Sequence, residues 1–178
     1  MSKAAGILSK LRPYVDTQIL ITVYNALVHS KLSYGILSWG SASNSLLQPI
    51  NVLQNRILRT VSKSGRYKNC TDMYLNMRIL KLQDVYDLEL TKFMHSFHHK
   101  SLPTCLISLF TLVQNAHSTS TRNFANNALY IPIVRKSSFL YSLEYRGSVH
   151  WNSIPNDLKS LTKSQIKKQY KILLLSKY

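Results

Sequence analysis

Acidic side chains are scarce in this chain. Seven Asp and Glu stand against 23 Lys and Arg in 178 residues, which gives a formal net charge of +16. The only cluster of acidic residues in the sequence comprises Asp84, Asp87 and Glu89. Catalysis by two metal ions needs converging carboxylates, but on a helix Glu89 lies on a different side from Asp87. We therefore predict no catalytic residues and interpret the group as a solvated helix face.

Glycine, proline and cysteine are also scarce. Five Gly and five Pro argue against a loop-rich or fibrous chain and favour helices. Cys70 and Cys105 belong to no CxxC pair, so nothing in the sequence supports a disulfide framework, and a reducing compartment is expected. Together with His95, His98 and His99 they carry atoms that bind zinc, but their spacing matches no zinc motif. Ordinary helix-end histidines are the favoured interpretation, so no metal site is predicted.

Long apolar runs are missing too. The longest, residues 19–28, is about half a membrane span and contains Thr22 and Asn25, so no transmembrane helix is expected. The N-terminus lacks the apolar segment of a secretory signal. Hydrophobic residues nevertheless make up 45% of the chain, too much for intrinsic disorder. A folded core is therefore expected.

Apolar residues recur at helical spacing along most of the chain, which predicts a mainly α fold with at most one or two short strands. A strand is expected at 128–134. Helices are expected at 3–12, from 17 toward 39, at 45–62, 71–77, 82–99, 103–110, 137–151 and 164–175. The polar segment 113–127 is interpreted as a linker between a helical domain, 1–112, and a basic C-terminal helical region, 128–178.

Periodicity also identifies the expected core. In the helix that begins at residue 17, the inward stripe is predicted to contain Ile19, Val23 and Leu27, widened by Leu20 and Tyr24. In the following helix, Ser45 and Gln48 resemble a capping box, which would place Pro49 in the first turn. Three aromatic residues that could stack on bases are interpreted instead as core or inter-helix anchors. They are Tyr34, Trp39 and Trp151.

Cations gather on two of the predicted helices. Arg56, Arg59 and Lys63 recur at spacings of three and four, and Arg66 and Lys68 follow in a loop. A stripe of this kind fits a phosphate backbone, with sequence-neutral and salt-dependent contacts. A solvated helix face remains the alternative. The second predicted stripe comprises Lys163, Lys167 and Lys171.

Five strings in order along the chain resemble one family. They are YNALVHSKLSYGILSWG at 24–40, LQNRILR at 53–59, LP at 102–103, HSTSTR at 117–122 and WNSIP at 151–155. Together they resemble the region that follows the palm in jockey-like non-LTR retrotransposon reverse transcriptases. In that family this region is a mostly helical thumb and post-thumb segment that holds the template–primer duplex.

The resemblance implies a thumb-like helical bundle followed by a smaller, mostly helical lobe. It implies a piece of an RNA-directed DNA polymerase that binds RNA, DNA or an RNA–DNA duplex. The palm with its Mg²⁺ is expected to lie outside this chain, which then needs no cofactor of its own, and the palm and fingers become a further partner. An intracellular location, nuclear or cytoplasmic, is implied. The open alternative is a non-catalytic basic helical protein that binds protein or an anionic membrane.

Overall fold

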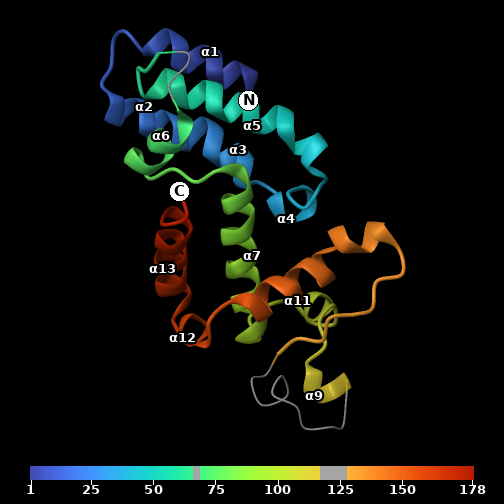
Figure 1. Cartoon of the computed structure of the whole chain (residues 1–178). Helices are drawn as coiled ribbons and strands as arrows, with labels where there is room; N and C mark the ends of the chain where they lie inside the picture. The colour runs from blue at the N-terminus through green and yellow to red at the C-terminus, as the bar shows by residue number, and fades with distance from the viewer. Residues whose placement is uncertain (66–68, 117–127) are drawn as a thin grey trace. The chain divides into compact units, whose positions relative to one another are not determined.

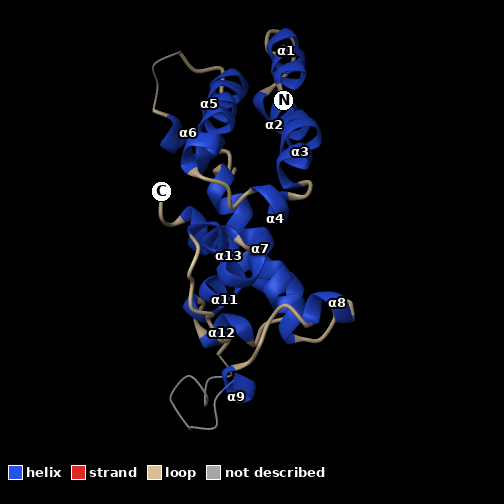
Figure 2. Ribbon diagram, turned by 90° about the vertical axis from the view of Figure 1, so that its right-hand side faces the viewer, coloured by secondary structure: helices blue, strands red, loops and turns tan. Residues whose placement is uncertain are grey.

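The computed structural model of the chain (Figure 1) describes residues 1–65, 69–116 and 128–178. Within these ranges the fold is mainly helical, as predicted (Figure 2). The expected strand at 128–134 does not form there; an isolated antiparallel bridge joins Leu112 and Leu129 instead. The Asn152 side chain accepts the Leu129 N–H at 2.9 Å and donates to its carbonyl at 2.8 Å, which satisfies this backbone without a sheet.

The chain forms two compact units. Unit 1 comprises Met1–Tyr86 and Lys171–Tyr178, and unit 2 comprises Asp87–Tyr170. Two long helices, α7 (Leu82–His98) and α13 (Lys163–Leu175), contribute to both units. The division predicted from the sequence stays a prediction, since most of its 113–127 linker lies outside the described residues.

Unit 1 is arranged around one long helix, α5 (Asn44–Val61). α1 (Ser2–Leu11), α2 (Thr17–Tyr24) and α6 (Cys70–Asn76) all contact α5. Between α2 and α5 the chain forms a π-helical turn, η1 (Asn25–His29), and two short helices, α3 (Ser30–Ser33) and α4 (Ile36–Trp39). In Figure 1, α1 (dark blue) lies beside α5 (teal).

Two helix starts in unit 1 differ from the prediction. α5 begins after Ser43, so Pro49 lies inside the helix and not in its first turn. Proline lacks an N–H, and the helix therefore forgoes one backbone hydrogen bond at this point. α6 begins at Cys70, one residue before the predicted start at 71, because Asn69 caps it: the Asn69 Oδ1 accepts the Thr71 N–H at 3.1 Å.

The core of unit 1 uses one side of the predicted stripe, the side formed by the residues expected to widen it. Leu20, Tyr24, Val28 and Leu32 are buried, whereas Ile19 is 50% exposed. The other two members of the predicted stripe, Val23 and Leu27, are half-buried. The buried stripe thus starts on Leu20 and Tyr24 in α2 and continues through the π-helical turn η1 to Val28.

A buried amide joins three segments of this core. Gln54 on α5 is fully buried, and its Nε2 donates to the Tyr24 hydroxyl and to the Leu80 carbonyl, both at 3.0 Å. Burial raises the pKa of Tyr24 to about 12, while the bond from Gln54 opposes that shift. The hydroxyl therefore stays neutral at physiological pH.

Unit 2 is built from shorter helices around the C-terminal part of α7. They are α8 (Thr104–Ile107), α9 (Val113–Ala116), the 3₁₀ turn η2 (Ser137–Tyr141), α11 (Leu143–Ser153) and α12 (Asn156–Lys159). The expected helix at 137–151 is thus two elements, because Ser142 caps a new helix by accepting the Tyr145 N–H at 3.2 Å. Trp151 is 1% exposed, which confirms it as a core anchor.

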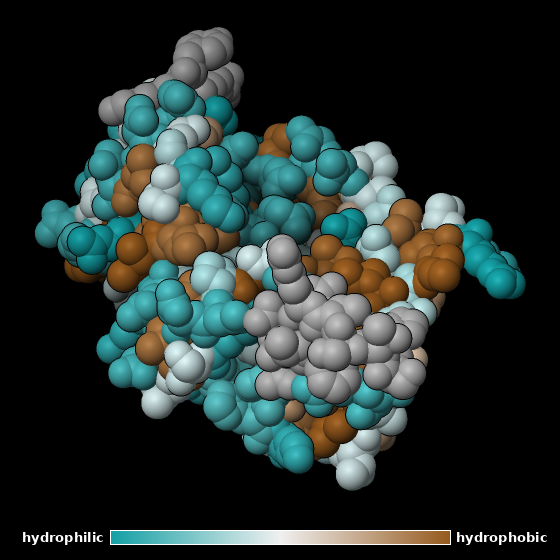
Figure 3. All heavy atoms as spheres, turned by 60° about the horizontal axis from the view of Figure 1, so that its bottom comes forward, coloured by the Kyte–Doolittle hydropathy of each residue, from teal (hydrophilic) through white to brown (hydrophobic). Residues whose placement is uncertain are grey.

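Hydrophobic residues also reach the surface. On the face drawn in Figure 3 they appear in several places between hydrophilic ones. Ile133 is 84% exposed and Ile172 66% exposed. Separate exposed residues are ordinary in folded proteins and do not mark a docking surface.

Candidate nucleic-acid interface

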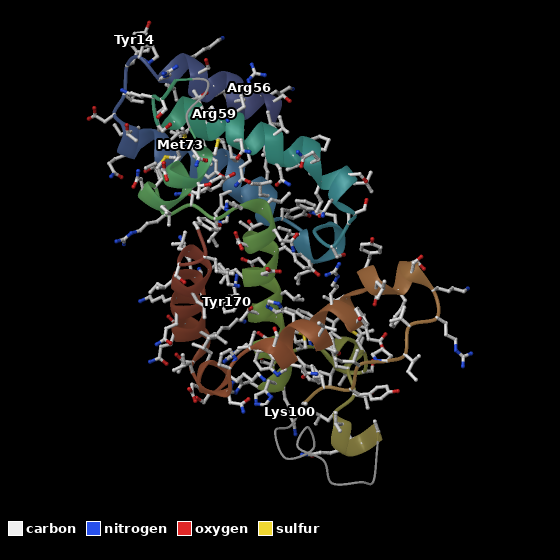
Figure 4. The ribbon with its side chains drawn as sticks, in the orientation of Figure 1. Tyr14, Arg56, Arg59, Met73, Lys100 and Tyr170 are labelled. Carbon is white, nitrogen blue, oxygen red and sulfur yellow. The ribbon has the colours of Figure 1, made fainter. Side chains whose placement is uncertain are left out.

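Two of the predicted site residues lie side by side on α5. Its buried residues occupy one face and include Ile57, Leu58 and Val61. Arg56 is exposed and Arg59 is half-buried, and both project from α5 (Figure 4). The helical spacing of three therefore brings these two cations together, as the sequence predicts.

A third arginine joins them from another helix. Arg12, the C-cap residue that follows α1, lines a hollow of about 480 Å³ together with Arg56 and Arg59. Val52, Thr60 and Ser64 complete its lining. We call this site the arginine hollow. Sequence reasoning missed Arg12, since periodicity within α5 says nothing about a residue brought in by the contact between α1 and α5.

The arginine hollow carries uncompensated positive charge. Within the described residues, Arg12, Arg56 and Arg59 form no salt bridge. The Nε of Arg59 is buried and has no hydrogen-bond partner there. Guanidinium groups stay charged at all physiological pH values and donate in a planar fork that matches phosphate and carboxylate oxygens. An anion with several oxygens is the ligand that this arrangement fits.

The rest of the first predicted stripe is only partly placed. Lys63 is exposed and lies just beyond the end of α5, in the left-handed conformation with φ of 53°. Arg66 and Lys68 lie outside the described residues. The role of all three in binding stays a prediction.

The second predicted stripe lies on α13. Lys163 and Lys167 are exposed and Lys171 is half-buried, at spacings of four. The buried residues of the same helix are Ile166, Tyr170 and Leu174. The lysines therefore lie on the side of the helix next to its buried stripe. Whether they bind nucleic acid stays a prediction.

A second hollow of about 510 Å³ adjoins the first, because Arg59 lines both. Most of its lining is amide and cationic, and we call it the amide hollow. Its polar lining includes Asn51, Asn55, Arg59, Asn69, Lys81 and Gln83. The hydroxyl of Tyr74, which also lines it, donates to Asn55 Oδ1 at 2.8 Å.

Lys81 is held at this second hollow by an aromatic ring. Its Nζ lies 4.1 Å from the ring centroid of Tyr178, and its backbone N–H donates to the Tyr178 hydroxyl at 2.8 Å. That hydroxyl donates to Asp84. Burial raises the pKa of Tyr178 well above its ordinary value, so the hydroxyl remains a donor.

The acidic residues near the start of α7 and the histidines considered as metal ligands each have partners in the structure. Asp84 accepts from Tyr178, and Glu89 forms a salt bridge with Lys92 at 2.5 Å. His95 Nε2 lies 2.7 Å from the Leu161 carbonyl oxygen. Within the described ranges, no three His, Cys, Asp or Glu side chains are grouped to hold a metal ion.

Tyr34 corrects one sequence interpretation. It is 85% exposed and is not a core anchor, whereas Trp39 is half-buried and donates from Nε1 to the Tyr34 carbonyl at 3.1 Å. Gly35 follows in the left-handed conformation, with φ of 59°. This turn ends the helical periodicity on which the interpretation of Tyr34 depended.

Comparisons with protein-family models, with curated proteins and with solved structures give no match to this chain. Among the described helices, none has both the length and the apolar content needed to cross a membrane.

Proposed function

We propose that this chain binds the phosphate backbone of nucleic acid through the arginine hollow, as a thumb-like module of the reverse-transcriptase type that its sequence resembles. The observation that carries the proposal is the convergence of Arg12, Arg56 and Arg59 from two helices without a salt-bridge partner in the described part of the chain. The expected ligand is an RNA–DNA duplex or either of its strands.

The charge of the arginine hollow supports an anionic ligand over a solvated surface. Its three guanidinium groups form no salt bridge within the described residues and repel one another, and a phosphate bound between them would neutralise that charge. The Nε of Arg59 is itself buried, so a ligand in the hollow would bind through the other guanidinium nitrogens.

The net charge of +16 supports the same ligand class. Each phosphate neutralised by a protein cation releases counterions, so binding to nucleic acid weakens as salt concentration rises. The exposed Lys163 and Lys167 are proposed as additional contacts of this kind. Contacts of this type fix the nucleic acid without reading its sequence.

The test is binding of a fluorescently labelled RNA–DNA duplex, measured by anisotropy between about 50 and 200 mM salt. The test variant combines Arg12→Gln, Arg56→Gln and Arg59→Gln. It should weaken binding at least about tenfold, since one hydrogen bond to a charged group contributes about 1.5–3 kcal/mol. It should also lower the salt slope by up to about three.

The matched control removes the same charge from unit 2, at the exposed Lys100, Arg135 and Lys136, also by substitution with Gln. Equal weakening by the two triple variants would mean that net charge alone drives binding, and the site assignment would be wrong. Tight binding to anionic vesicles without affinity for the duplex would favour the alternative function, a membrane-binding protein.

A further inference from the structure

The amide hollow differs chemically from the arginine hollow beside it. A phosphate accepts hydrogen bonds only, so a phosphate site needs donors alone. Carboxamides present an acceptor oxygen as well as donors, and four of them, Asn51, Asn55, Asn69 and Gln83, line this hollow. Donor and acceptor side by side is the pattern that matches the edge of a nucleobase. The lining therefore suits a base better than a second phosphate.

Several of these groups are available to a ligand. Asn51 is half-buried and its side-chain amide forms no hydrogen bond within the described residues, so the amide oxygen and the amide nitrogen are both unused. Asn55 Oδ1 is occupied by the Tyr74 hydroxyl, and Asn69 Oδ1 by the Thr71 N–H. Those two side chains keep their amide nitrogens as donors.

The geometry of the hollow is set before any ligand binds. Tyr74 is 3% exposed, and its hydroxyl fixes Asn55 at 2.8 Å. Tyr178 fixes Lys81 through its ring and its hydroxyl. Side chains already ordered lose less conformational entropy on binding, which favours recognition of one defined shape.

We infer that the amide hollow receives a single unpaired nucleobase whose adjacent phosphate lies on Arg59. This inference rests on the proposed function and names the part of the nucleic acid that the second site takes. Arg59 lines both hollows, so one nucleotide can place its phosphate in the first and its base in the second. The volume of about 510 Å³ lies in the range of small-molecule sites. The amide edge of Asn51 would pair with the edge of the base.

The consequence is a preference for nucleic acid that carries an unpaired base. A base inside a duplex cannot enter a pocket without unpairing and unstacking, which is unfavourable. The experiment compares two RNA–DNA duplexes with the same short single-stranded overhang. In one the overhang carries bases, and in the other its nucleotides are abasic. The wild-type chain should bind the first about tenfold more tightly, the ratio expected for one bidentate contact to a base edge.

The decisive variant is Asn51→Leu, which removes one donor and one acceptor at nearly constant size. It should abolish the preference for the base-bearing overhang while leaving affinity for the abasic duplex unchanged. The control is Gln48→Leu, an exposed position on the same helix that does not line the hollow. It should keep the preference. Arg56→Gln should weaken binding of both duplexes by the same factor.

The outcomes separate the two proposals. Equal affinity of the wild-type chain for the two duplexes overturns the base site and leaves the phosphate site standing. Retention of the preference by Asn51→Leu overturns the assignment of the amide hollow. Absence of affinity for either duplex overturns the proposed function and the base site together.

Discussion

Replacement of Gly147 by alanine tests how closely α11 packs inside unit 2. A Cβ at this position would lie 2.8 Å from Met94 Sδ and 2.8 Å from Phe110 Cε1. Both neighbours are buried, and the Phe110 ring also packs against Phe97, with ring centroids 5.0 Å apart. The added methyl group therefore cannot be accommodated by a small movement into solvent.

Two opposing effects set the expected magnitude for Gly147→Ala. Alanine stabilises a helix interior by about 0.5–1 kcal/mol relative to glycine. Overpacking of a well-filled core destabilises by about 1–3 kcal/mol. The net expectation is a loss of roughly 1–2 kcal/mol in the free energy of unfolding. Gly6 in α1 is the matched control, because no atom lies within 4 Å of a Cβ placed there. Gly6→Ala should stabilise by about 0.5–1 kcal/mol.

Urea unfolding measures both effects. In a Trp39→Phe background, fluorescence comes from Trp151 alone and reports on unit 2, where Gly147 lies. Far-UV circular dichroism follows Gly6→Ala. Opposite signs for the same chemical change would confirm the packing argument. An unchanged or higher midpoint for Gly147→Ala would show that α11 does not approach Met94 as closely as described.

Three further results are expected from urea unfolding followed by far-UV circular dichroism, which does not depend on Trp151. Trp151→Ala should cost about 3–5 kcal/mol of unfolding free energy, whereas Tyr34→Ala should change it by less than about 0.5 kcal/mol. Gln54→Ala should cost several kcal/mol, since it leaves two buried groups without the partner they have now, at about 1–3 kcal/mol each. Burial lowers the pKa of His95 and of His98 below the ordinary 6.5, so the folded state binds fewer protons than the unfolded state. The free energy of unfolding should have its full value above about pH 6.5 and fall as the pH drops below it. A urea midpoint that stays constant between about pH 8 and 5 would contradict this.

Local sequence signals were sufficient for the helical class of the fold. The periodicity of apolar residues located α1, α5, α7 and α13 to within a few residues, because the same residues that favour a helix also form its buried face. Trp151 was identified as a core residue on a different ground, its large aromatic side chain beside a proline-containing turn, and it is buried.

The features that could not be predicted from the sequence depend on the local geometry of a helix and on contacts between segments far apart in the chain. No local signal in the sequence predicted the π-helical turn η1, which carries the buried Val28. Arg12 entered the candidate site through packing of α1 on α5, which periodicity within one helix cannot reveal. The residues that line the amide hollow come from α5, from the α6 region and from the start of α7. They are far apart in the sequence, so a search for motifs of fixed spacing could not group them.

The separation of packing from charge in unit 1 makes the binding proposal testable. α1 contacts α2 and α5, and its buried residues are Ala4 and Leu8, whereas Arg12 stands at its end. The apolar residues hold the two helices together, and the arginines add repulsion without contributing salt bridges in the described chain. Neutralising Arg12 and Arg56 should therefore preserve or raise stability while it weakens binding. A polyanion that binds only the folded state should in turn raise the unfolding temperature of the wild-type chain more than that of the neutralised one.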